Sequence, residues 1–154
     1  MIKVNVITNY TKLKKQLGNL EIYLKKKAKK LNTNNIFFKN KNLEFSILLS
    51  DNNEIKKYNK KFRKKNKITD VLSFPFYEKK ELINMLKLKK LIYLGDIIIN
   101  LDMVVNSEYK KNIKSKLDEL WLHSLIHLLG GRHKLNKDYQ KMYKLEKRYF
   151  KSIN

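Results

Sequence analysis

Four stretches of the chain show the hydrophobic pattern of β-strands. Residues 2–7 alternate and are rich in β-branched side chains, while residues 45–50 and 95–100 are short apolar runs. Residues 97–99 are apolar on successive positions, so the strand over residues 95–100 should be buried on both faces. The fourth stretch, residues 71–74, precedes Pro75, the only proline, which should lie at a strand end or on a sheet edge.

Between these stretches, apolar positions recur at the helical spacing of three and four residues. From Leu13 to Leu31 they predict one amphipathic helix, in which Gly18 marks no boundary. Asp51 is a suitable N-cap for a short helix that follows it. Further helices are predicted over residues 52–61, 101–110 and 138–150.

Two segments lack a clear period. Residues 32–42 are mostly polar and predict a loop, whereas residues 77–93 fit either a long loop or a short helix. With no internal repeat and no linker rich in proline or serine, residues 1–154 should form one domain. The order of elements predicts an α+β fold, in which a small mixed β-sheet has helices packed mainly on one side.

The helix predicted to follow Ser115, which carries two of the histidines, is the most apolar of all. Leucine, isoleucine and tryptophan cover two of its sides, so it should run through the core. Ser115 is the expected N-cap, with Asp118 at the third helical position as in a capping box. Gly130 and Gly131 should end the helix by adopting positive φ angles.

All three histidines of the chain lie in or just after this helix. His123 and His127 are four residues apart, which places both imidazoles on one helix face, and His133 follows the glycine turn. A single histidine on such a helix is usually a core residue, but three together favour a metal site. Three imidazoles with a free fourth position predict one Zn²⁺ that also binds water, and the absence of cysteine excludes a closed thiolate site.

The same spacing, with a glycine three residues after the second histidine, occurs in metzincin proteases. Those enzymes use a glutamate directly after the first histidine to polarise the metal-bound water. Ser124 stands at that position here and has no basic group at neutral pH. A metalloprotease is therefore a less favoured hypothesis.

The composition indicates a soluble cytoplasmic protein with no membrane association. There is no cysteine, no pattern of a signal peptide and no apolar run long enough to span a bilayer. The formal net charge is +22, which fits a polyanionic partner such as RNA. The many Lys, Asn and Ile residues fit equally well a genome that favours their codons.

Two further motifs, together with the histidine run, resemble the YbeY family. They are Thr69-Asp-Val-Leu-Ser-Phe-Pro75, at the end of a matching stretch that begins at Asn59, and Leu94-Gly-Asp96. The similarity covers about residues 43–150 and includes Met142-Tyr-Lys-Leu-Glu146. Members of this family are bacterial rRNA maturation factors described as zinc-dependent, single-strand-specific endoribonucleases.

The resemblance implies roles for specific residues. His123, His127 and His133 would bind the metal, and Arg63 would be the functional arginine of a groove that binds phosphate. The implied partners are single-stranded and ribosomal RNA, with proteins of the small ribosomal subunit as further candidates. The resemblance also implies a function in processing the 3′ end of the small-subunit rRNA and in ribosome quality control.

The chain departs from the family pattern at three positions. Arg132 and Asn66 stand where aspartate is common, and Ile68 stands where proline is common. With arginine at position 132, the site lacks a carboxylate there that could orient a metal-binding histidine. Glu119, one turn before His123, is a further candidate for that task, although a first-turn acid at a helix N-terminus is the simpler interpretation.

Two alternatives stay open besides the metalloprotease. One is a ribosome assembly factor that binds rRNA and whose zinc mainly stabilises the fold. The other is a plain RNA-binding module, which would not need three clustered histidines. For the nuclease, zinc on three neutral imidazoles lowers the pKa of bound water to about 7, and attack by the 2′-hydroxyl of the RNA is the other possible route.

Overall fold

A computed structural model describes residues 1–8, 10, 17–88, 90–106, 113–133 and 135–154. Its sheet contains β1 (Ile2–Thr8), β2 (Leu43–Ser50), β3 (Val71–Pro75) and β4 (Ile92–Asn100). The strand order is β1-β2-β4-β3, in which β1, β2 and β4 are parallel and β3 is antiparallel to β4. This mixed sheet confirms the predicted fold class, and Pro75 ends the edge strand as expected.

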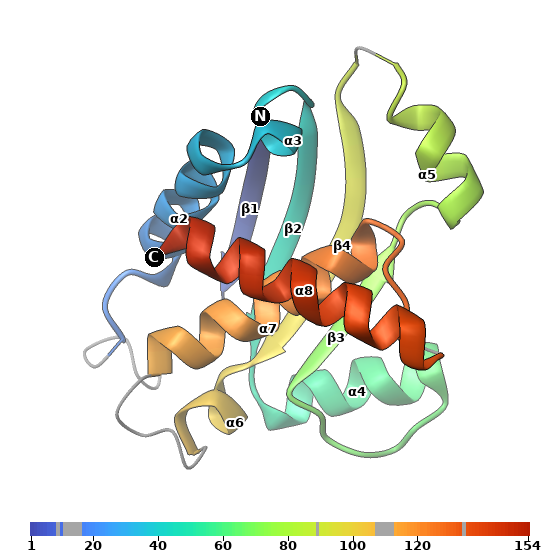
Figure 1. Ribbon diagram of the computed structural model, residues 1–154. Coiled ribbons are helices and arrows are strands. Elements are labelled where there is room, and N and C mark those ends of the chain that lie inside the picture. Colours follow the sequence, from blue (N-terminus) through green and yellow to red (C-terminus); the bar gives the residue numbers. More distant parts are fainter. Residues whose placement is uncertain (9, 11–16, 89, 107–112, 134) are drawn as a thin grey trace.

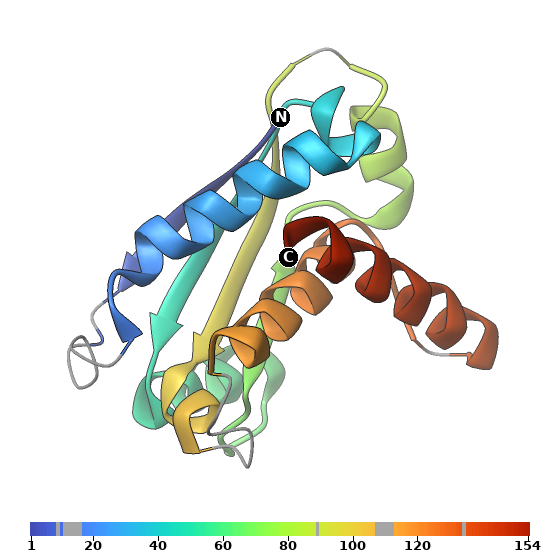
Figure 2. The ribbon, with the colours of Figure 1, turned by 60° about the vertical axis from the view of Figure 1, so that its left-hand side comes forward.

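The helices cover the two faces of this sheet unequally. They are α2 (Leu20–Asn34), α3 (Ile36–Lys39), α4 (Asn52–Arg63), α5 (Lys79–Met85), α6 (Leu101–Asn106), α7 (Ile113–Leu128) and α8 (Asn136–Ile153). Figures 1 and 2 show α2, α7 and α8 on the same face, with α8 as the outer layer across α7. None of the described helices combines the length and the apolar character needed to cross a membrane.

Alternate residues of the strands point into two separate cores. Ile97 and Ile99 of β4 belong to the larger core, where the ring of Phe45 stacks on that of Trp121 at 6.3 Å. Ile98 belongs to a smaller core that includes Ile55 of α4, so α4 lies on the opposite face of the sheet. The strand is therefore buried on both faces, as its apolar run predicts.

The single helix predicted from Leu13 to Leu31 is interrupted at Gly18 and Asn19: Leu17 is still helical, and α2 begins at Leu20. Gly18 has a φ angle of 68°, in the left-handed region that glycine adopts without strain. The side chain of Asn19 then accepts a hydrogen bond from the backbone N of Ile22 at 3.0 Å and caps α2. The prediction that Gly18 marks no boundary is wrong, and residues 11–16 lie outside the described part.

The predicted loop at residues 32–42 is also partly wrong. Helix α2 continues to Asn34, and the side chain of Asn35 accepts a hydrogen bond from the backbone N of Phe37 at 3.1 Å at the start of α3. Phe38 is fully buried, so burial of one aromatic ring holds this short turn against the core. Residues 77–93 are predicted to form either a long loop or a short helix, and the helix α5 confirms the short helix.

Ser115 is not the N-cap of the histidine helix, because α7 already begins at Ile113. Asp118 is buried within the helix instead of capping it. Its carboxylate accepts hydrogen bonds from the hydroxyl of Tyr23 at 2.8 Å and from Nε1 of Trp121 at 3.0 Å, and it pairs with Lys27 at 3.1 Å. This network attaches α2 to α7, which carries the histidines.

The helix predicted over residues 101–110 corresponds to α6, which the structure describes from Leu101 to Asn106. The remaining residues, 107–110, lie outside the described part.

Candidate metal centre

The three histidines predicted as metal ligands converge in space. His123 and His127 lie one turn apart on α7, with their Nε2 atoms 3.0 Å apart. The ring of His133, from the loop after α7, has its centroid 5.8 Å from that of His123 and 5.0 Å from that of His127. Each residue offers one ligand atom, and these atoms all lie within 4.8 Å of one another. The cluster could therefore bind one metal ion.

The other ring nitrogens of two histidines are held by groups outside the cluster. Nδ1 of His123 lies 2.5 Å from Oε1 of Glu146 on α8, and Nδ1 of His127 lies 2.9 Å from the carbonyl oxygen of Gly131. Both partners are hydrogen-bond acceptors, so each Nδ1 carries the proton and each Nε2 keeps its lone pair for a metal. Ligating histidines in proteins usually show this arrangement, so the donor set fits a metal ion.

The electrostatics of His127 favour a neutral imidazole. Its half-buried position lowers its pKa below the ordinary 6.5, because burial disfavours the charged form. The hydrogen bond to the carbonyl of Gly131 acts in the opposite direction, whereas the nearby charges of His123, His133 and Arg63 lower the pKa further. A neutral ring at pH 7 is the form that binds a metal.

Two glycines build the turn between the second and third histidines. Gly130 has a φ angle of 85°, as predicted, but Gly131 does not share the positive φ predicted for it. A Cβ atom on Gly131 would lie 2.5 Å from Cγ2 and 2.8 Å from the carbonyl oxygen of Ile126. Gly131 is thus required for close approach of the chain to α7, which brings its carbonyl to His127.

Arg63 lies close enough to the histidine cluster for its charge to act on His127. It is the last residue of α4, and Lys64, with a φ angle of 58°, ends the helix after it. One guanidinium nitrogen donates a hydrogen bond to the carbonyl oxygen of Ser73 at 3.1 Å, and the group lies 6.0 Å from the ring centroid of Phe74. Its position beside β3 makes its charge one of those that lower the pKa of His127.

The family model described as Endoribonuclease YbeY matches residues 6–154. The chain belongs to the YbeY family. The match confirms the resemblance found in the sequence and extends it beyond residues 43–150, almost to both ends of the chain.

Two relatives align with nearly the full length of the chain. A protein of Pelagibacter ubique named Endoribonuclease YbeY is 41% identical over 162 residues, which cover 99% of this chain and 97% of the relative. A protein of the same name from Buchnera aphidicola is 34% identical over 157 residues, with coverage of 97% and 92%.

The fold also has a solved counterpart. A solution structure of a protein from Thermotoga maritima matches with a TM-score of 0.59 at 24% sequence identity. The match covers 99% of this chain and 89% of that protein. At this identity the likeness supports the α+β architecture and nothing more specific.

One residue of the site was not identified from the sequence. Glu146 was part of the stretch that resembles YbeY proteins, but the carboxylate considered for orienting His123 was Glu119. Glu119 instead lies 3.6 Å from Lys116, and it is not in the first turn of α7, which begins at Ile113. The sequence does show that Glu146 is a carboxylate on the inner side of the last amphipathic helix. Local spacing cannot show that its partner is His123, which lies 23 positions earlier in the chain.

Arg132, one of the three expected departures from the family pattern, is not the partner of the Nδ1 atom of His123 or of His127; those partners are Glu146 and Gly131. Its guanidinium donates a hydrogen bond to Oε2 of Glu78 at 3.3 Å, and both side chains are largely exposed. Asn66 and Ile68, the other two departures, are exposed in the segment between α4 and β3. Glu146 supplies a carboxylate to the site from a different element.

Proposed function

We propose that this protein is a metal-dependent endoribonuclease that cleaves single-stranded RNA. Its proposed task is maturation of ribosomal RNA, notably at the 3′ end of the small-subunit rRNA, and ribosome quality control. The observation that carries the proposal is the convergence of three histidine nitrogens, on which the charge of Arg63 also acts, in a chain of the YbeY family. RNA as the substrate class follows from the names of the relatives.

The metal would be held by His123, His127 and His133. A set of imidazole nitrogens without thiolates is most often a zinc site, and three protein ligands are typical of catalytic zinc. When bound, the ion supplies Lewis-acid chemistry that makes water more acidic and stabilises charge on phosphate oxygens. Glu146 and the carbonyl of Gly131 orient two of the rings by accepting their Nδ1 hydrogens.

Arg63 is proposed to bind the phosphate at which cleavage occurs. A guanidinium presents donors in a planar fork that matches two phosphate oxygens, which a lysine ammonium cannot do. The hydrogen bond to the carbonyl of Ser73 uses one guanidinium nitrogen and orients the group, and the other donors can still meet a ligand. Negative charge that develops on the phosphate oxygens during cleavage is stabilised by this cation.

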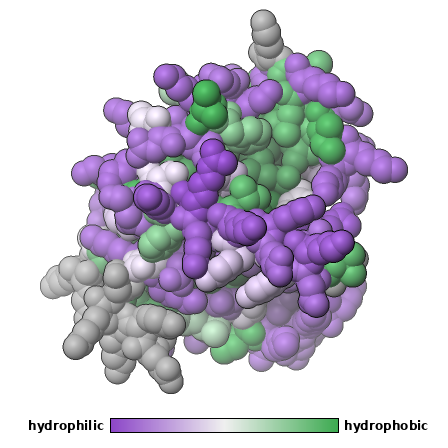
Figure 3. Space-filling view, viewed as in Figure 1, coloured by the Kyte–Doolittle hydropathy of each residue, from purple (hydrophilic) through white to green (hydrophobic). Residues whose placement is uncertain are grey.

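Exposed aromatic rings near the cluster support a preference for single strands. Tyr143 and Glu146 line one cavity, and the ring of Tyr143 is parallel to that of Tyr139 at 6.5 Å with Nζ of Lys147 4.5 Å away. Unpaired bases can stack on such rings while lysines attract the phosphates, whereas paired bases are already stacked. Hydrophilic side chains dominate most of the face seen in Figure 3.

The protease hypothesis gains no support from the position of Ser124. This residue occupies the place of the protease glutamate, and its side chain is fully buried within α7. A buried hydroxyl cannot act as a general base on a water molecule in the site. Peptide hydrolysis by the route of the metzincins therefore has no base at that position.

The test is cleavage of a labelled single-stranded RNA, with a duplex of the same sequence as the control. We expect cleavage of the single strand only, loss of cleavage after chelation and recovery when zinc is added back. His127→Ala should lose both zinc, measured by elemental analysis, and cleavage. A folded His127→Ala protein with full activity would contradict the proposal. A ligand variant that is inactive on RNA but still supports ribosome maturation in cells would favour the assembly factor.

A further inference from the structure

A cavity of about 360 Å³ lies directly beside the histidine cluster. It is open to solvent and bordered by the end of β3, the start of α5 and the glycine turn after α7, and its lining includes Phe76, Tyr77, Glu78, Glu81, His127 and Arg132. The volume is within the range of pockets for small ligands, roughly 300–1,000 Å³. Because His127 is one of the proposed ligands, any molecule in this cavity lies next to the metal centre.

Phe76 presents an aromatic ring to this cavity. The residue is 64% exposed, although a side chain of this type is normally buried. Its ring makes T-shaped contacts with Tyr77 at 4.9 Å and with Tyr93 at 5.9 Å between centroids. These contacts hold the ring in place while much of it stays open to a planar partner, such as a nucleobase.

Arg132 provides a cation on the same cavity. Its side chain is 54% exposed and its partner Glu78 is 79% exposed, with 3.3 Å between Nη2 and Oε2. An exposed ion pair of this kind contributes little to stability, so a competing anion can replace the glutamate at low cost. Phosphate, like a carboxylate, can accept two parallel hydrogen bonds from the guanidinium fork.

We propose that this cavity is a subsite for one nucleotide of the RNA strand, adjacent to the bond that is cleaved. Arg132 binds the phosphate of that nucleotide in place of Glu78, and Phe76 stacks on its base. The inference rests on the proposed endoribonuclease function and extends it, because it assigns a role to the arginine that replaces the usual aspartate before His133.

A purely structural role for Arg132 makes a different prediction. If the ion pair only attached the loop of His133 to α5, then removing either partner would loosen the loop and weaken RNA binding. If Arg132 binds phosphate, the two changes have opposite effects, because loss of Glu78 frees the arginine. The signs of the two effects therefore distinguish these roles.

The experiment measures binding without cleavage. Metal-free full-length protein is titrated against a fluorescent single-stranded RNA by anisotropy at several salt concentrations. Arg132→Ala should weaken binding about tenfold and reduce the slope of log affinity against log salt by about 0.7, the value for one phosphate contact on a single strand. Glu78→Gln, which keeps an oxygen at the start of α5, should strengthen binding up to about fivefold. It should have no effect when combined with Arg132→Ala.

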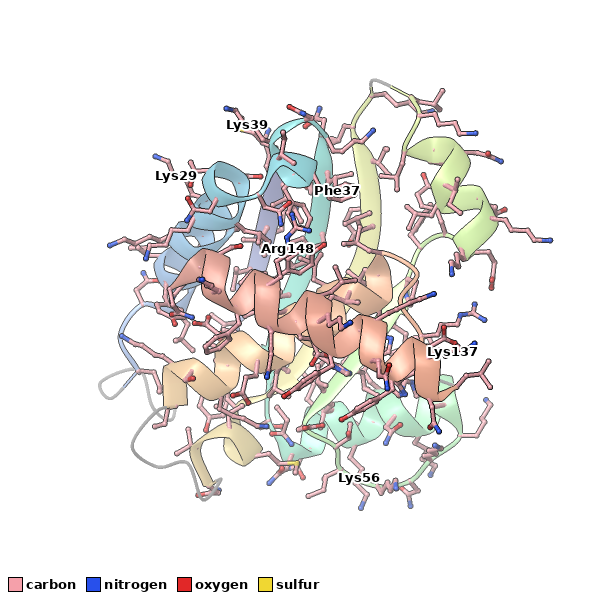
Figure 4. The ribbon with its side chains drawn as sticks, viewed as in Figure 1. Lys29, Phe37, Lys39, Lys56, Lys137 and Arg148 are labelled. Carbon is pink, nitrogen blue, oxygen red and sulfur yellow. The ribbon has the colours of Figure 1, made fainter. Side chains whose placement is uncertain are left out.

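Two controls isolate the subsite from the general positive charge. Arg148→Ala removes the same charge from α8, where Figure 4 shows Arg148 well away from α4, and it should leave the salt slope unchanged. Phe76→Ala should weaken binding about tenfold, whereas Phe76→Tyr, which keeps the ring, should bind like the unmodified chain.

The subsite is wrong if Arg132→Ala and Glu78→Gln change affinity in the same direction, if Arg132→Ala retains the full salt slope, or if the metal-free protein binds no RNA. Cleavage by the zinc-loaded protein is measured separately. Absent cleavage with the predicted binding pattern would reject the nuclease function and leave the subsite intact. If cleavage depends on the metal but Arg132→Ala leaves RNA affinity unchanged, the subsite is rejected and the nuclease function stands.

Discussion

Nδ1 of His123 lies 2.5 Å from Oε1 of Glu146, a residue 23 positions further along the chain. The contact joins α7, which carries two of the histidines, to α8, which packs across it. The orientation of one proposed metal ligand thus depends on how these two helices pack. Glu146 would therefore be a positioning residue, which acts on a metal bound by His123 only through that imidazole.

Glu146→Gln should weaken zinc binding roughly 10–100-fold, because the neutral amide is a poorer acceptor for the Nδ1 hydrogen of His123. Affinity is measured by competition with a chromogenic chelator. Glu119→Gln is the matched control, because this carboxylate lies near Lys116 and should not affect zinc affinity. Equal effects of the two changes would show that general charge, and not orientation of His123, is responsible.

Gly131→Ala should destabilise the protein by about 1–3 kcal/mol, because the added methyl group overlaps the side chain and carbonyl of Ile126. The shift of the turn should also weaken zinc binding, since the carbonyl of Gly131 holds His127. Denaturant unfolding and zinc titration measure the two effects. Gly18→Ala adds a methyl group in open space at a positive φ, so it should cost about 1–2 kcal/mol and leave zinc affinity unchanged.

Arg63→Lys should lower kcat/KM for single-stranded RNA roughly 10–100-fold while zinc content stays the same, because the charge is kept but the planar fork is lost. Steady-state cleavage and elemental analysis are the measurements. Lys56→Ala, on the outer side of the same helix in Figure 4, is the control for loss of one positive charge on α4 and should have little effect. Retention of full activity by Arg63→Lys would remove the arginine from the proposed mechanism.

In metal-free protein, His127 should titrate below pH 6.5, mainly because burial disfavours its charged form. Between that lowered pKa and 6.5, the unfolded chain binds more protons at this residue than the folded chain does. The contribution of His127 to the free energy of unfolding therefore falls as the pH drops through 6.5.

NMR can follow this titration, because the chain has only three histidines and the signal of His127 is identified by its loss in His127→Ala. Urea unfolding at a series of pH values then measures the stability. A pKa of His127 at or above 6.5 in the metal-free protein would contradict the expected desolvation.

The strands and most helices could be predicted because their signals are local. Alternation of side chains in β1 and the apolar run of β4 follow from periods of a few residues. The start of α2 was missed because Gly18 is compatible with a helix interior as well as with the left-handed turn that it forms. Ser115 fits the cap motif because that motif depends only on neighbouring residues, whereas the helix starts earlier, at Ile113.

By itself, the sequence determined the fold class and the candidate ligands. Two histidines four apart on a helix must share a face, and a glycine turn brings a third one near them, so local geometry suffices. Only the tertiary structure decided the order of the strands, the pairing of Glu146 with His123 and that of Arg132 with Glu78, which are 54 positions apart. Such contacts depend on how whole elements pack against one another, and no short window of residues specifies that packing.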